Sequence, residues 1–140
     1  MHFDLLDAIL EISDDRIRAV KQVSSAEEYL GDHFPGFPIL PGVLMVETMT
    51  QAARRLLEHR DATAGTDDIR RYVLGGVKAF KYGAMVRPGE ALEVDVTIKK
   101  TLDDGTVECR GTGRVRRAGA AEAEETAASG RFTMRRSNRA

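Results

Sequence analysis

The sequence is poor in the residues that several classes of function require. It has no tryptophan and only 6% aromatic residues, which leaves few surfaces on which nucleic-acid bases could stack. Its single cysteine, Cys109, cannot form a disulfide within the chain, and this favours a reducing cytoplasm. The 21 lysines and arginines nearly balance the 22 aspartates and glutamates, and a net charge of −1 gives no overall attraction to nucleic acid.

Long hydrophobic runs are also missing. No apolar stretch approaches the roughly 20 residues that cross a bilayer, and the N-terminus lacks the basic and apolar regions of a signal peptide. The histidines are dispersed and cysteine is scarce, so no metal site is expected. Hydrophobic residues make up 42% and charged residues 31%, which is typical of a globular protein. We expect residues 1–140 to form one cytoplasmic domain with no membrane partner.

One segment has the pattern of a long helix. Residues 43–58 follow Pro41 and Gly42, which suit a helix N-terminus. The first turn is apolar on all sides and a wide apolar surface continues beyond it, so we expect the helix to be largely buried. The polar run at residues 60–68 is expected to end the helix as a surface loop.

Most of the remaining chain has the pattern of strands. Strands are expected at residues 16–23, 72–82, 92–98, 107–115 and 127–134. Residues 92–98 alternate strictly between apolar and polar side chains, as half-buried antiparallel strands do. Asp104-Gly105 predicts a hairpin turn, and residues 118–125 a loop. One buried helix with a long antiparallel sheet predicts an α+β fold in which the sheet wraps the helix.

Three of the four prolines lie in one segment, DHFPGFPILPGVLMVE at residues 32–47, which leads a histidine directly into the helix. Pro35 and Pro38 restrict Phe34 and Phe37 to extended conformations. Such a loop loses little entropy when it holds a side chain in place. With an ordinary pKa of about 6.5, His33 is suited to act as a general base; the alternative is a structural or solvent-exposed histidine.

Glu47 lies in the second turn of the expected helix, among apolar neighbours. It is either a solvent-exposed glutamate or a buried carboxyl whose raised pKa would let it act as a general acid. Gln51, four residues further on, either holds Glu47 through a hydrogen bond or is polar filler. Gly42 lets the chain turn into the helix, and its amide could also stabilise developing negative charge; these two roles are compatible.

This segment closely resembles the active-site segment of the FabZ-type 3-hydroxyacyl-acyl-carrier-protein dehydratases. The matching pattern is HFPGxPxxPGVxxxExxxQA from His33 to Ala52, with the acid 14 positions after the histidine. The resemblance extends more loosely to residues 3–12, similar to the family's first strand region, and to residues 78–81 and 87–90.

The resemblance implies a hotdog fold, in which a long antiparallel β-sheet wraps a central α-helix. It also implies homodimers, or trimers of dimers, whose active sites lie at the dimer interface. The implied reaction converts a (3R)-3-hydroxyacyl thioester into a trans-2-enoyl thioester and water in fatty-acid biosynthesis. His33 would remove the α-proton, and the partner subunit's Glu47 would protonate the departing hydroxyl.

The resemblance further implies how the substrate is held. The residues implied to bind or position it are Gly42, Val43, Gln51, Phe34 and Phe37. The Gly42 amide would polarise the thioester carbonyl, Gln51 would orient Glu47, and the phenylalanines would line an apolar tunnel for the acyl chain. No metal or dissociable cofactor is implied, because the substrate arrives on the phosphopantetheine arm of acyl carrier protein.

The chain departs from the family pattern in two places. We expect the family's N-terminal segment containing His-Arg to be absent, and Asp32 stands where a glycine is common. The Asp32 carboxylate either approaches His33 and raises the pKa of the imidazole, or points to solvent. Two other functions stay open: a dehydratase that also isomerises the double bond, and a non-catalytic hotdog protein that binds acyl chains or serves as a partner subunit.

Two basic groups complete the candidate features. One comprises Lys78, Lys81 and Arg87, and the other lies within residues 131–139 near the C-terminus. Each is either a solvated surface or a docking site for an acidic partner. We expect the acidic carrier to dock beside Lys78, Lys81 or Arg87.

Overall fold

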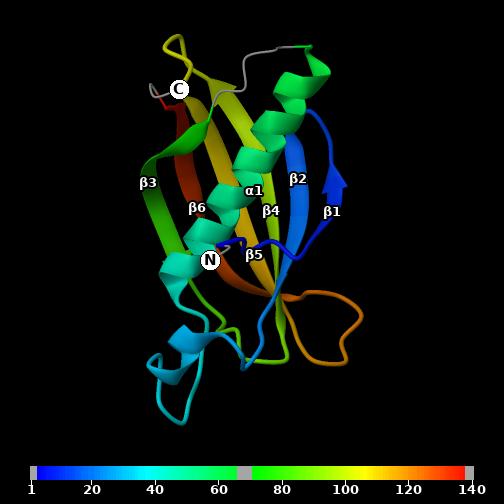
Figure 1. Ribbon diagram of the computed structural model, residues 1–140, viewed down its shortest axis with the longest axis vertical. Coiled ribbons are helices and arrows are strands. Elements are labelled where there is room, and N and C mark those ends of the chain that lie inside the picture. Colours follow the sequence, from blue (N-terminus) through cyan, green and yellow to red (C-terminus); the bar gives the residue numbers. More distant parts are fainter. Residues whose placement is uncertain (1–2, 66–70, 138–140) are drawn as a thin grey trace.

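The computed structural model of the protein describes residues 3–65 and 71–137. Along the chain the elements are β1 (Ala8–Ile12), β2 (Arg16–Gln22), the short 3-10 turn η1 (Glu28–Gly31), α1 (Gly42–Thr63), β3 (Tyr72–Tyr82), β4 (Ala91–Thr101), β5 (Val107–Arg116) and β6 (Glu125–Arg136). The six strands form one antiparallel sheet in the order β1-β2-β4-β5-β6-β3, and α1 crosses one face of it (Figure 1). This is the predicted α+β hotdog fold.

Alternation along the central strands produces the inner face of the sheet. In β4, Leu92, Val94 and Val96 are buried, while their polar neighbours are more exposed. The buried residues of β5 alternate in the same way, and together with the buried face of α1 they form one core. The expected strands are confirmed, with ends that differ by up to three residues, and Asp104-Gly105 forms the β4–β5 turn. Gly105 adopts φ +87°, a conformation that glycine tolerates best.

The helix is longer than its sequence pattern predicted. It begins at Gly42 and continues to Thr63, so residues 60–63 are helical and not a loop; residues 66–68 of that expected loop lie outside the described residues. A tertiary contact favours the extension, because the Tyr72 hydroxyl donates a hydrogen bond to Asp61 at 3.1 Å.

The expected burial of the helix is found in its middle, from Thr48 to Ala53 and at Leu56 and Leu57, but its apolar first turn is only partly buried in a single chain. Met45 is buried, but Leu44 and Val46 are only partly covered, and the side chain of Val43 is 72% exposed. The sheet covers only one side of a helix, so an all-round apolar turn leaves part of its surface without a partner.

Candidate active site

The loop between η1 and α1 is held in one shape by its own backbone. Phe34 and Phe37 exchange two hydrogen bonds, of 3.1 and 2.9 Å, and the Ile39 amide donates to the His33 carbonyl at 2.9 Å. The His33 amide donates in turn to the Tyr29 carbonyl of η1 at 3.2 Å. Backbone hydrogen bonds therefore hold both the amide and the carbonyl of His33, in the loop predicted from its prolines.

The His33 imidazole is oriented by the same loop. Its Nδ1 lies 2.9 Å from the Ile39 carbonyl oxygen, and the ring stacks on Phe34 with centroids 4.3 Å apart. A carbonyl oxygen only accepts hydrogen bonds, so in the neutral imidazole Nδ1 carries the hydrogen and Nε2 has the free lone pair. Asp32 is exposed and makes no ion pair with His33 in the described chain, which favours the solvent-pointing alternative.

Glu47 and Gln51 are joined by a hydrogen bond on α1. The Gln51 amide nitrogen donates to Glu47 Oε1 at 3.1 Å, as the four-residue spacing suggested. Gln51 is only 7% exposed, and its other contacts are with the N-terminal segment: it accepts from the Leu5 amide at 2.8 Å and donates to the Phe3 carbonyl at 3.2 Å. Glu47 is half-buried in the single chain.

The start of α1 presents uncapped amides. Pro41 is the N-cap and offers no side-chain hydrogen bond to the first turn, which starts with Gly42 and Val43. A methyl group added at Gly42 would lie 2.6 Å from the ring of Tyr82, so this tyrosine lies directly against the helix start. Nothing in the sequence indicated that contact, because the two residues are far apart in the chain.

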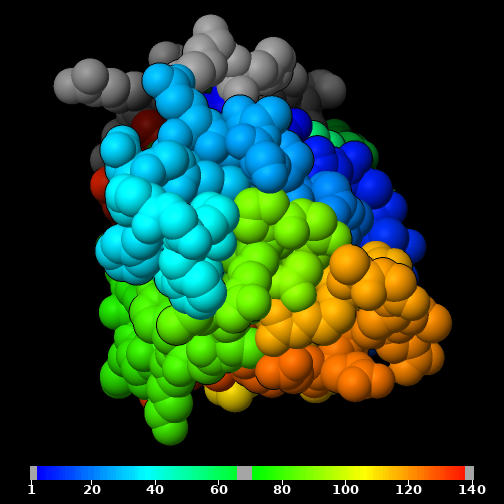
Figure 2. Space-filling model, turned by 90° about the horizontal axis from the view of Figure 1, so that it is seen from below, coloured from blue at the N-terminus to red at the C-terminus, as the bar shows by residue number. Residues whose placement is uncertain are grey.

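The segment that follows β3 packs against the His33 loop. Figure 2 shows the chain near residues 30–40, in cyan, lying against the yellow-green segment that follows β3. The Leu40 amide donates to the Val86 carbonyl at 2.8 Å, and the guanidinium of Arg87 lies 4.8 Å from the centroid of the Phe37 ring. The expected basic group is therefore divided. Arg87 borders the loop, whereas Lys78 lies on β3, opposite Arg131 of β6 in the sheet register.

Comparison with known proteins connects this arrangement to one family. The model of the FabA-like domain matches residues 1–124. The chain is 42% identical to the 3-hydroxyacyl-[acyl-carrier-protein] dehydratase FabZ of Oenococcus oeni, over 71% of this chain and 70% of that protein. The chain belongs to the FabZ-type dehydratase family. A second FabZ dehydratase, from a Polaromonas species, is 39% identical over 86% of this chain and 82% of its own length.

Solved structures place this FabZ-type protein in the same fold as more distant proteins. The dehydratase heterocomplex ApeI:P from Xenorhabdus doucetiae has a TM-score of 0.71 at 18% identity, covering 96% of this chain and 84% of that one. The protein smu.793 from Streptococcus mutans, bound to acetyl CoA, has a TM-score of 0.68 at 15% identity, covering 98% and 92%. At these identities the likeness concerns the fold alone.

The groups of this FabZ-type enzyme that could take part in catalysis lie at one end of the sheet. The loop supplies an imidazole with a free Nε2, and the first turns of α1 supply uncapped amides and a carboxyl. Within the described residues, no three His, Cys, Asp or Glu side chains are close enough to hold a metal ion. None of the helices in residues 3–65 and 71–137 is long and apolar enough to span a bilayer.

Proposed function

We propose that the protein dehydrates (3R)-3-hydroxyacyl-acyl-carrier-protein to trans-2-enoyl-acyl-carrier-protein in fatty-acid biosynthesis. The observation that carries this proposal is the 2.9 Å contact between His33 Nδ1 and the Ile39 carbonyl. It leaves Nε2 as the basic atom on a loop that has little freedom to move. The FabZ dehydratases that match this chain provide the substrate class.

The proposed reaction divides proton removal and proton donation between two side chains. His33 Nε2 takes the proton from carbon 2, and the electrons move toward the thioester oxygen, where the amides of Gly42 and Val43 stabilise the charge. The partner subunit's Glu47 gives its proton to the hydroxyl on carbon 3, which leaves as water while the double bond forms. Acid–base groups contribute about 100- to 10,000-fold each, and one oxyanion donor about 3–4 kcal/mol.

We propose that the site is completed by a second copy of the chain, in a homodimer or a trimer of dimers. β3 is an edge strand of 11 residues, most of them exposed, so one side of its backbone is available for pairing. Apolar side chains at the site are exposed in the single chain, including Val43, Phe34 and Phe37. A partner that covers them would remove apolar surface from water and bring its own residues to the site.

We further propose that acyl carrier protein docks beside Arg87. Its guanidinium lies over Phe37 at the edge of the His33 loop, which suits an acidic partner that delivers a thioester there. The acyl chain would lie along the apolar residues of the loop and helix start. Phosphopantetheine would belong to the carrier, and the chain itself would act as one cytoplasmic domain without a metal or dissociable cofactor.

A turnover assay on enoyl-carrier thioesters tests the proposed reaction. Wild type should hydrate crotonyl- and longer enoyl-carrier substrates, and His33→Ala and Glu47→Gln should each lower kcat at least about 100-fold. His59→Ala and Glu58→Gln, on the distal part of the same helix, are the matched controls and should keep activity. Full activity of either site variant would contradict the role given to that residue.

The same assay separates the other two functions. A dehydratase that also isomerises would accumulate a cis-3 product from the trans-2-enoyl thioester. A non-catalytic acyl-binding protein would retain carrier-linked substrate without converting it.

A further inference from the structure

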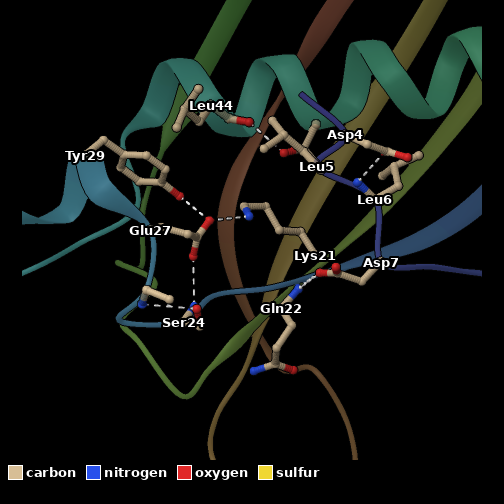
Figure 3. Close-up of polar contacts among 12 residues, drawn as sticks. Asp4, Leu5, Leu6, Asp7, Lys21, Gln22, Ser24, Glu27, Tyr29 and Leu44 are labelled. Carbon is tan, nitrogen blue, oxygen red and sulfur yellow. Dashed lines mark hydrogen bonds and ion pairs between the residues drawn. The ribbon is translucent and has the colours of Figure 1, made fainter. Parts of the chain in front are cut away.

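A charged cluster lies between β2 and the turn that precedes the His33 loop, with Lys21 buried and Glu27 and Tyr29 half-buried. Lys21 is only 5% exposed, and its ammonium lies 2.5 Å from Glu27 Oε1. The Tyr29 hydroxyl donates to the same oxygen at 2.5 Å, and Glu27 Oε2 accepts the Ser24 amide at 2.8 Å. Figure 3 shows Lys21 and Tyr29 approaching the Glu27 carboxylate from opposite sides.

Filling space in the core does not explain this cluster, because burying a lysine costs free energy of desolvation. Lys21 shares the inner face of β2 with Ile17 and Ala19, where an apolar side chain would pack without losing hydration. Burial acts to raise the pKa of Glu27, but hydrogen bonds from Lys21, Tyr29 and the Ser24 amide outweigh it and hold the pKa below its ordinary value. The carboxylate therefore stays ionised near neutral pH and keeps both of its side-chain partners.

The cluster is connected to the proposed catalytic base through one residue. Tyr29 lies in η1, and its carbonyl accepts the amides of Asp32 and His33, each at 3.2 Å. Ile39 makes two further contacts with His33: its amide donates to the His33 carbonyl, and its carbonyl lies against His33 Nδ1. The hydrogen bond of the His33 amide therefore depends on the position of Tyr29. The Tyr29 hydroxyl is in turn held by Glu27.

We propose that Lys21, Glu27 and Tyr29 are positioning residues that hold the His33 imidazole in its working orientation. This inference rests on the proposed role of His33 as base. None of the three is expected to touch substrate, so their loss should reduce kcat and leave KM nearly unchanged. Misplacing a reacting group by about 1 Å is enough to cost roughly 100-fold in rate.

A double variant distinguishes positioning from simple stabilisation. Lys21→Met with Glu27→Leu removes both charges and refills the space with apolar groups, which often preserves or improves stability. We expect a folded protein whose kcat is about 10- to 100-fold lower, with KM within about threefold of wild type. A folded double variant with the kcat of wild type would overturn the proposal.

Three single variants give two gentler tests and a control. Tyr29→Phe keeps the ring and removes only the hydroxyl, and should lower kcat by about 3- to 10-fold. Glu28→Gln makes the same charge change as Glu27→Gln one residue away, on an exposed side chain, and should leave kcat unchanged. Equal kcat values for Tyr29→Phe, Glu27→Gln and Glu28→Gln would count against the cluster, even if the double variant failed to fold.

Nitrogen NMR of the imidazole tests the proposal without turnover. In wild type, His33, assigned by comparison with His33→Ala, should show hydrogen on Nδ1 only; Glu27→Gln and Tyr29→Phe should shift or broaden both ring signals. Unchanged signals would overturn the positioning role. An inactive wild type with shifted variant signals would contradict the dehydratase function and leave the positioning role standing.

Discussion

His33 has two ring nitrogens, and a carbonyl six residues further along the chain decides which of them is available as a base. Because the Ile39 oxygen occupies Nδ1, proton transfer is directed to Nε2. Gln51 shows the same dependence on a neighbour, since its carbonyl oxygen is occupied by the Leu5 amide and only its nitrogen faces Glu47. At the scale of single residues, each proposed catalytic group is oriented by a backbone or side-chain partner.

Gly130 offers a test of how tightly the sheet is packed. A Cβ at this position in β6 would overlap the ring of Phe80, which packs against the core. Gly130→Ala should therefore lower the free energy of unfolding by about 1–3 kcal/mol, measured by urea denaturation. Gly76→Ala is the control, because its nearest neighbour is the Thr133 hydroxyl at 3.6 Å. Equal stability of both variants would show that Phe80 moves aside freely.

Glu27 should make stability depend on acid pH. Its pKa in the folded protein lies below its ordinary value of 4.5, through the hydrogen bonds that outweigh burial. A lowered folded pKa contributes stability that is complete above the unfolded pKa and is lost as the pH falls through the folded pKa. The free energy of unfolding should thus fall more steeply below about pH 4.5 in wild type than in Glu27→Gln.

Urea denaturation between pH 3 and 7 measures this difference in slope. Glu28→Gln should follow wild type, because its carboxylate is exposed in the same turn. Parallel curves for wild type and Glu27→Gln would mean that the carboxylate gains nothing from its partners on folding.

At the scale of elements, α1 and β3 both present surface that a single chain leaves uncovered. The first turn of α1 is apolar on every side, yet the sheet reaches only part of it. β3 is paired with β6 along one side only and has its other side at the end of the sheet. Both features are explained if a second copy pairs along β3 and covers the helix start.

A charge placed on the β3 edge tests this explanation. Val77 is 48% exposed in the middle of β3, and Val77→Lys should shift the protein toward monomers in sedimentation experiments. Activity should fall in parallel, because the proposed site takes residues from both copies. Ile9→Lys, on the short edge strand β1, is the control and should preserve the assembly. An unchanged sedimentation profile for Val77→Lys would exclude β3 as the interface.

At the scale of the whole molecule, the proposed site is built from segments that are distant in sequence. Arg117, in the connection between β5 and β6, holds the connection between β3 and β4: it donates to Glu90 at 2.7 Å and to the Met85 carbonyl at 3.1 Å. The segment containing Met85 also carries Arg87, which contacts the His33 loop. The connection that borders the proposed base is thereby fixed by a residue from a third part of the chain.

Charge reversal on that surface tests the proposed docking of the carrier. Arg87→Glu should raise the apparent KM for carrier-bound substrates roughly 3- to 10-fold at low salt, with less effect on a small thioester that lacks the carrier. Lys100→Glu, near the end of β4 that is distant from Arg87 and outside the proposed interface, is the matched control and should leave KM unchanged. Equal KM values for wild type and Arg87→Glu at low salt would remove Arg87 from the docking site.

Much of the architecture followed from local patterns in the sequence. Strand-like patterns located β2 to β6, whereas β1 was expected only from the family resemblance. The proline-rich segment ending in Glu47 identified the family, because such a motif, like a strand pattern, is a property of neighbouring residues. The end of α1 was less predictable, since residues 60–63 are polar and are favoured as helix by a contact with Tyr72. η1 has too few residues to show a period.

The sequence by itself therefore determined the fold class, the family and the candidate base, acid and helix-start amides. Only the tertiary structure decided that Nε2 is the free nitrogen, that Tyr82 lies against Gly42, and that Arg87 rather than Lys78 borders the loop. The reason is physical: periodicity and turn chemistry act between neighbours, whereas each of these contacts depends on how the folded chain brings chosen groups together. The packing of distant segments decides which polar groups come into contact.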